Sequence, residues 1–122
     1  MPRPLFDHTK VHPAIRDKIA GFHPEMIEEA TRAIAAHPVV VIGMKQNPFP
    51  KRAKKALAAH GTPFHYLEYG SYLGDYRRRL ALKMWTGWST FPMIFVKGTF
   101  IGGAEDLASL LASGEFDTLL AA

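Results

Sequence analysis

The stretch VVVIGMKQNPFPKRAKKAL, residues 39–57, reads as a strand, a tight loop and the start of a helix. Residues 39–43 form a continuous apolar run rich in β-branched side chains, which is typical of a strand buried on both faces. Asn47 and Pro48 suit the start of a helix, because asparagine is a preferred N-cap and proline fits the next position. Gly61 closes this helix.

Further elements are expected on the C-terminal side of this unit. Residues 62–70 alternate aromatic and polar side chains, as a strand does, and residues 72–87 predict a helix with Leu73, Tyr76, Leu80 and Met84 on one side. Residues 92–98 and 99–103 predict two strands joined by a tight turn at Lys97-Gly98. A helix over 104–113 and a last short helix over 115–122 complete the chain.

Two helices are expected before the first strand. Pro13 occupies a favourable first helical position, and Ile15 and Ile19 lie one turn apart. Pro24 opens a second helix, which has glutamates near its start and ends at His37-Pro38. We therefore predict a helical extension over residues 1–37, packed on a domain over residues 38–122.

This order of elements predicts an α/β protein with the thioredoxin-like fold. A strand, a helix and a second strand must give parallel strands joined by a right-handed crossover. The closing hairpin adds antiparallel strands, so the expected core is a four-stranded mixed sheet with helices on both faces.

The composition excludes several kinds of chemistry. The sequence has no cysteine, which removes disulfides, thiolate nucleophiles and cysteine-held metal centres unless another molecule supplies the sulfur. The six histidines show no reliable metal-ligand spacing, so no metal is expected.

No apolar run approaches the roughly 20 residues that span a bilayer, and the first residues lack the apolar core of a signal peptide. We expect a cytoplasmic protein without a membrane contact.

The charge is unevenly distributed along the chain. Nine lysines and arginines lie in the segment from Lys45 to Lys83, whereas every charged side chain after Lys97 is acidic. A basic middle can attract a small anion or an acidic partner, or it can simply be a solvated helix face. Nucleic-acid binding is not expected, because the aromatic and basic alternation of single-strand binders is missing.

Two segments resemble the glutaredoxin family. WSTFPMIFVKGTFIGGAEDL, residues 88–107, is similar to the second half of glutaredoxins, where Thr-X-Pro leads into a hairpin and then Gly-Gly before a helix. GMKQNPFPKRAKKAL, residues 43–57, resembles the active-site loop, with NPFP where dithiol members carry Cys-Pro-Tyr-Cys. Lys45, Arg79 and Trp88 resemble the monothiol branch more closely. The resemblance covers about residues 38–120 and leaves residues 1–37 unexplained.

The resemblance implies a glutathione pocket with no catalytic residue. Asn47 replaces the nucleophilic cysteine and is explained by helix capping, or alternatively by a hydrogen bond to a ligand. A cis bond is expected before Pro92, where the family pairs the backbone of the preceding residue with an extended peptide. The residues placed around glutathione are Lys45, Asn47, Phe49, Arg79, Thr90, Phe91, Pro92, Gly103, Ala104 and Glu105.

The resemblance also assigns charges to the two ends of the ligand. Lys45 and Arg79 match positions that hold the glycyl carboxylate, and Glu105 matches an acid near the amino group, where many members have aspartate. Glutathione has two carboxylates and an ammonium, so its site needs both signs of charge. Alternatively, Arg79 belongs to an exposed basic turn, and Glu105 with Asp106 only complements a helix dipole.

Thiol–disulfide exchange requires a thiolate on the protein. We therefore expect a redox-inactive glutathione-binding or regulatory module linked to redox homeostasis, without the family's iron–sulfur cluster, which needs a protein cysteine. Two alternatives remain. One is a glutathione-dependent oxidoreductase or transferase that uses the thiol of the bound tripeptide. The other is a protein that binds a glutathionylated or acidic partner through its basic surface. Self-association would use the N-terminal helices.

Overall fold

The computed structural model describes residues 6–70 and 76–122. Its elements are a 3-10 helix η1 (His8–Lys10), α1 (Pro13–Ala20), α2 (Pro24–Ala36), β1 (Val39–Gly43), α3 (Pro48–Ala59), β2 (His65–Glu68), α4 (Tyr76–Thr86), β3 (Met93–Val96), β4 (Thr99–Gly102), α5 (Ala104–Ser113) and α6 (Glu115–Ala121). The predicted order of helices and strands is confirmed. Leu73, predicted on the fourth helix, lies outside the described residues.

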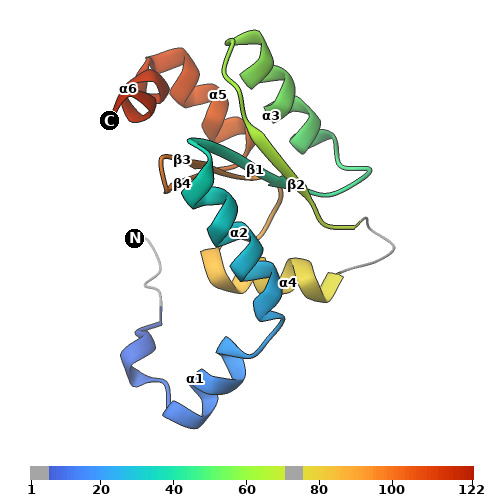
Figure 1. Cartoon of the computed structure of the whole chain (residues 1–122), viewed down its shortest axis with the longest axis vertical. Helices are drawn as coiled ribbons and strands as arrows, with labels where there is room; N and C mark the ends of the chain where they lie inside the picture. Colours follow the sequence, from blue (N-terminus) through green and yellow to red (C-terminus); the bar gives the residue numbers. More distant parts are fainter. Residues whose placement is uncertain (1–5, 71–75) are drawn as a thin grey trace.

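The four strands form one mixed sheet in the order β2-β1-β3-β4. Strand β1 runs parallel to β2 and antiparallel to β3, and it pairs Val41 with Tyr66 on one side and with Ile94 on the other. Strands β3 and β4 form the predicted hairpin, with a register irregularity between Ile94 and Phe95. This is the sheet of the predicted thioredoxin-like fold (Figure 1).

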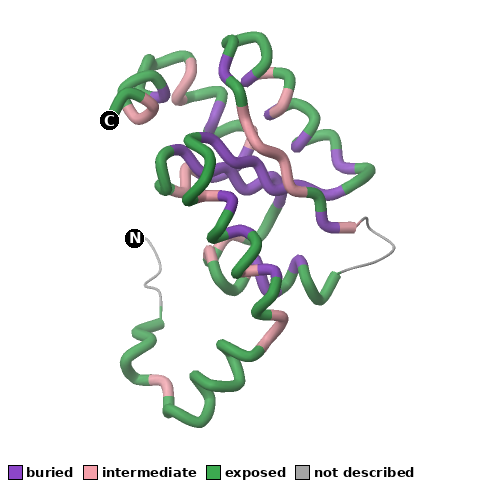
Figure 2. Tube along the Cα trace, viewed as in Figure 1, coloured by how far each residue is buried: buried purple, intermediate pink, exposed green. Residues whose placement is uncertain are grey.

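The alternation of side chains along β1 divides the core into two layers. Val40 and Ile42 pack in a cluster with residues of α2 and α4, whereas Val39 and Val41 pack with residues of α3, α5 and α6. All five residues of β1 are buried, as the apolar run predicts. Helices therefore cover both faces of the sheet, and the sheet is the most buried part of the chain (Figure 2).

The two leading helices differ in how they contribute to this core. Helix α2 supplies Met26, Ala30 and Ala33 to the same cluster as β1, whereas α1 has no buried residue. Figure 1 shows α1 at the end of the molecule away from the sheet. The predicted boundary between residues 37 and 38 stays a prediction. Within residues 6–70 and 76–122, every helix is too short or too polar to cross a bilayer.

The register of the strands brings three distant loops to one edge of the sheet. Ile42 near the end of β1 pairs with Met93 at the start of β3, and Ile94 pairs with Gly102 at the end of β4. The loop after β1, the segment before β3 and the start of α5 therefore meet at this edge.

Candidate functional site

A pocket of about 240 Å³ lies where these three loops meet. It is lined by Phe49, Trp88, Thr90, Phe91, Pro92, Gly103, Ala104, Glu105 and Asp106. Most of these residues were predicted from the sequence as neighbours of one ligand, and the fold brings them together. The peptide bond between Phe91 and Pro92 is cis, which confirms that expectation. Lys45, Asn47 and Arg79 do not line the pocket.

Asn47 connects the start of α3 to the segment before β3. Its Oδ1 accepts a hydrogen bond of 2.9 Å from the Phe49 N–H, which confirms the predicted N-cap. Its Nδ2 lies 3.5 Å from the Phe91 carbonyl oxygen, and only 8% of the residue is exposed. The position at which the resemblance implies a thiol thus holds a buried carboxamide that hydrogen-bonds two segments of the pocket wall.

The start of α5 forms the opposite wall. The Asp106 carboxylate accepts a hydrogen bond of 2.9 Å from the Gly103 N–H and so caps this helix. Gly102 has a φ of +97°, and a Cβ there would lie 2.5 Å from Asp106 Oδ2, so both the backbone conformation and the space require glycine. Asp106 therefore has a structural partner, while Glu105 is exposed at the pocket.

Lys45 and Arg79 both contact the chain that follows β2. The Lys45 N–H donates to the Gly70 carbonyl at 2.7 Å, and Arg79 Nη1 donates to the Tyr69 carbonyl at 3.2 Å. Arg79 is buried, which differs from the alternative of an exposed basic turn. The guanidinium faces inward because this backbone carbonyl gives it a buried partner.

Tyr69 fixes this region to α2. Its hydroxyl donates a hydrogen bond to the Glu29 carboxylate, and the residue is buried. Burial, together with this hydrogen bond and the nearby negative charge of Glu29, raises the pKa of Tyr69 above its ordinary value. The tyrosine therefore remains a neutral hydrogen-bond donor over the physiological pH range.

Two cations lie near aromatic rings that line the pocket. The Arg52 guanidinium lies 5.1 Å from the centre of the Phe49 ring, and Lys83 Nζ lies 5.8 Å from the centre of the Phe91 ring. Glu105 belongs to the opposite wall. The pocket therefore has aromatic walls and a carboxylate on the α5 side, and two cations lie next to its phenylalanine rings without lining it.

Three residues of this region were not among the site residues predicted from the sequence. Trp88 lines the pocket, and its Nε1 is buried without a hydrogen-bond partner among the described residues. Asp106 caps α5, and Lys83 approaches Phe91. Because Asp106 is the third residue of α5, it could have been predicted to cap that helix. Lys83 lies one turn after Arg79 on α4, so it could have been predicted to lie near the same site.

The comparisons with known protein sequences agree on one family. The sequence model of the glutaredoxin family, described as "Glutaredoxin", matches residues 39–101. A glutaredoxin-like protein of Dictyostelium discoideum is 42% identical over 106 residues, which cover 87% of this chain and 86% of that protein. A probable monothiol glutaredoxin of Legionella pneumophila is 34% identical over 77 residues, covering 63% of this chain and 83% of that one.

Solved structures give the same result. A wheat glutaredoxin superimposes with a TM-score of 0.70 at 32% identity, over 80% of this chain and 94% of that chain. A buckwheat glutaredoxin solved as a glutathione complex superimposes with a TM-score of 0.71 at 24% identity, over 80% of this chain and 89% of that chain. The chain belongs to the glutaredoxin family, as a member whose 122 residues include no cysteine.

Proposed function

We propose that this protein binds glutathione non-covalently in the pocket between α3, the segment before β3 and α5. The observation that carries the proposal is one aromatic pocket that has Glu105 in its wall and two cations, Arg52 and Lys83, beside its phenylalanine rings. Glutathione requires this combination, because it carries two carboxylates and one ammonium. The buckwheat protein of the same fold binds glutathione, which supports the same ligand here.

The orientation of the ligand follows from these charges. The ammonium of the γ-glutamyl residue would face Glu105, and its carboxylate would face the N–H groups at the start of α5. The glycyl carboxylate would lie toward Lys83 and toward the region of Lys45 and Arg79. The cysteinyl part would then lie beside Asn47 and Phe49.

The absence of cysteine from the chain determines whether a bound ligand would react covalently with the protein. In thiol–disulfide exchange, a protein thiolate attacks one sulfur of a disulfide and releases the other sulfur as a thiolate. No residue of this chain can supply that thiolate. A glutathione molecule or a glutathione mixed disulfide would therefore be held and released with its covalent bonds unchanged, as suits a regulatory or carrier module.

Titration of the full chain with reduced glutathione tests this proposal. We expect a dissociation constant of about 1 mM or lower by calorimetry, with NMR shift changes confined to the pocket residues. The Glu105→Gln variant should bind about three- to tenfold more weakly, because it loses the charge opposite the ammonium. Glu115→Gln, at the start of α6, is the matched control and should bind like the unmodified protein. No binding at millimolar glutathione would overturn the proposal.

The position of the α3 N-terminus supports a second candidate function. Phe49, in the first turn of α3, lines the pocket, so the positive end of the helix dipole would lie close to the sulfur of a bound glutathione. This field would favour the thiolate of bound glutathione, which could then reduce a mixed disulfide or attack an electrophile. A turnover assay separates the two functions, since a rate equal to that of free glutathione would exclude catalysis and leave binding.

A further inference from the structure

A second surface, which shares no lining residue with that pocket, carries most of the exposed large apolar side chains of the described residues. Within residues 6–70 and 76–122, the large apolar side chains that are more than 40% exposed include Ile15 and Ile19 of α1, and Leu80, Met84 and Trp85 of α4. Exposed apolar residues that occur singly are ordinary, whereas a contiguous group indicates a contact surface. These five residues come from two helices far apart in the sequence.

The two helices border a pair of neighbouring apolar hollows. One, of about 310 Å³, is lined by residues of α1, α2 and α4, and the other, of about 300 Å³, by residues of α1 and α4. Ile19, Phe22 and Met84 line both hollows, so these form one continuous feature. We call this feature the α1–α4 surface, defined by Ile19, Phe22, Leu80, Met84 and Trp85 of the hollows together with Ile15, which lies one turn before Ile19 on α1.

Helix α1 is too short to be stable through its own hydrogen bonds. It has eight residues, none of them buried, whereas isolated helices shorter than about 12 residues are marginal in water. Local bonds help, since the Ala14 N–H donates to His12 Nδ1 and Arg16 donates to the Thr9 and Val11 carbonyls. These contacts fix the start of the helix but leave Ile15 and Ile19 about half exposed. A partner that covers them would stabilise α1.

The chain itself carries the kind of segment that such a groove accepts. Apolar anchors one turn apart on a short helix are the usual ligand of an apolar groove. Ile15 and Ile19 of α1 have this spacing, and Phe22 follows just after the helix ends. The charges beside the hollows are opposite, because Glu28 of α2 lines one hollow and Lys18 of α1 lines the other. A two-fold axis exchanges the two copies, so each Lys18 can meet the other copy's Glu28.

We propose that two copies of this chain form a two-fold symmetric dimer through the α1–α4 surface, with Lys18 of each copy paired with Glu28 of the other. The apolar side chains of α1 in one copy then fill the hollows of the other, and each α1 is covered by its partner. This dimer leaves the glutathione pocket open, since none of the residues that define the α1–α4 surface lines that pocket.

Sedimentation velocity of the full chain over a wide concentration range tests the dimer. We expect a monomer–dimer equilibrium in the micromolar range. Ile19→Glu and Met84→Glu should each raise the dimer dissociation constant by about tenfold or more, because each places a carboxylate in the apolar contact. Phe6→Glu is the matched control, since Phe6 is 76% exposed and lies outside both hollows. It should sediment like the unmodified chain.

A charge exchange tests the pairing without touching the apolar contact. Lys18→Glu alone and Glu28→Lys alone should each weaken the dimer, whereas the double variant should restore it, because the opposite charges again face each other. A chain that stays monomeric at the highest soluble concentration would overturn the proposal and leave the surface to a different protein or an apolar small molecule. A dimer that persists in both Ile19→Glu and Met84→Glu would overturn it as well.

Discussion

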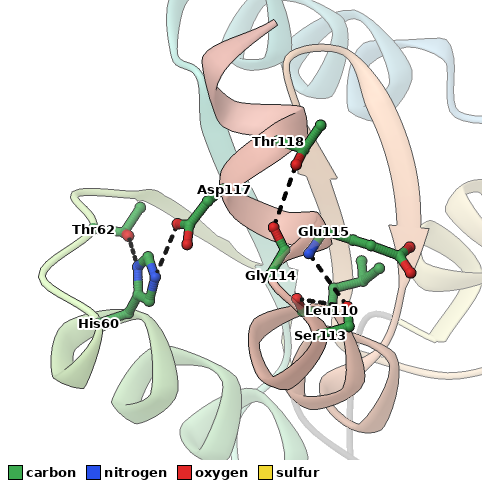
Figure 3. A network of polar contacts seen from close by, with 8 residues as sticks. All are labelled: His60, Thr62, Leu110, Ser113, Gly114, Glu115, Asp117 and Thr118. Atoms are coloured by element: carbon green, nitrogen blue, oxygen red, sulfur yellow. Dashed lines mark hydrogen bonds and ion pairs between the residues drawn. The ribbon is translucent and has the colours of Figure 1, made fainter.

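The two ends of α3 are held by different kinds of contact. At the N-terminal end, the Asn47 carboxamide bonds the helix start and the Phe91 carbonyl, next to an open pocket. At the C-terminal end, His60 hydrogen-bonds the Thr62 hydroxyl at 2.7 Å through Nδ1 and contacts Asp117 Oδ1 at 3.0 Å through Nε2 (Figure 3).

The difference lies in what surrounds each end. Helix α6 closes the C-terminal end, where the buried Phe116 packs edge-on against His60 with ring centres 5.4 Å apart. The N-terminal end instead faces space that a ligand can fill. We conclude that substitutions at the N-terminal end should change chemistry and binding, whereas substitutions at the C-terminal end should change stability and leave the pocket intact. The predictions below test this separation.

The largest effect is expected from Asn47→Cys. A thiol at the N-cap of α3 would ionise readily beside the helix N-terminus. It would attack the glutathionyl sulfur of a mixed disulfide and release the substrate thiolate, after which a second glutathione would regenerate the thiolate and leave as glutathione disulfide. We expect deglutathionylation on the order of 10³-fold faster than with the unmodified protein, because the pocket orients the reacting sulfurs.

Asn47→Ser is the matched control for this gain of activity. Serine is also a preferred N-cap, so it keeps the helix start while supplying no thiol. The product thiol released at fixed glutathione concentration measures the rate. Equal rates for the serine and cysteine variants would contradict the idea that the N-terminal end of α3 retains a functional pocket geometry.

Most of the fold could be predicted from the sequence because its signals are local. The apolar run of β1, the turn at Lys97-Gly98 and the cap at Asn47 each depend on nearby residues. Strand β2 differs most from its predicted length, since residues 62–70 were expected and only His65–Glu68 pair as a strand. Its first residues close α3 instead, because the Thr62 N–H donates to the Leu57 carbonyl.

The candidate site was predicted only where sequence motifs carry it. The residues of the Thr90–Pro92 and Gly103–Glu105 segments line the pocket together because the strand register fixes both segments. The role of Arg79 beside a glycyl carboxylate stays a prediction, and its burial could not be predicted because it depends on packing against the Tyr69 carbonyl. Trp88 and Lys83 could not be assigned, because their approach to the pocket depends on how α4 and its following loop pack.

Phe116→Ala should give the largest loss of stability. Phe116 is fully buried in the cluster that joins α3, α5 and α6 to the sheet, and its truncation leaves a cavity. We expect the free energy of unfolding to fall by about 3–5 kcal/mol, whereas Phe116→Leu should cost about 1 kcal/mol. Denaturant unfolding measures both. Glutathione affinity should be unchanged while the variant is folded, and a large loss of affinity would contradict the separation of the two ends.

Tyr69→Phe should have a smaller effect that depends on pH. Removing the hydroxyl breaks the hydrogen bond to Glu29 and should lower the free energy of unfolding by about 1 kcal/mol at neutral pH. Because the folded-state pKa of Tyr69 is raised, its contribution is present below the unfolded value of about 10 and is lost as the pH rises beyond it. Stability of the unmodified protein should therefore fall more steeply in alkali than stability of the variant. Parallel unfolding curves from neutral to alkaline pH would contradict this.

The smallest effect is expected from Asp117→Asn. Its carboxylate contacts His60 from α6, but the aspartate side chain is 64% exposed and the histidine side chain 31% exposed. Water and salt screen such a contact, so the free energy of unfolding should fall by about 0.5 kcal/mol or less. Glu115→Gln removes an equal charge from the same helix and should change stability still less, because its side chain is outside the His60 contact. If the free energy of unfolding fell by more than it does in Phe116→Leu, α6 would be held mainly by the polar network of Figure 3 rather than by the buried ring. That result would contradict the prediction that the buried ring contributes more than the exposed polar contact at this end of α3.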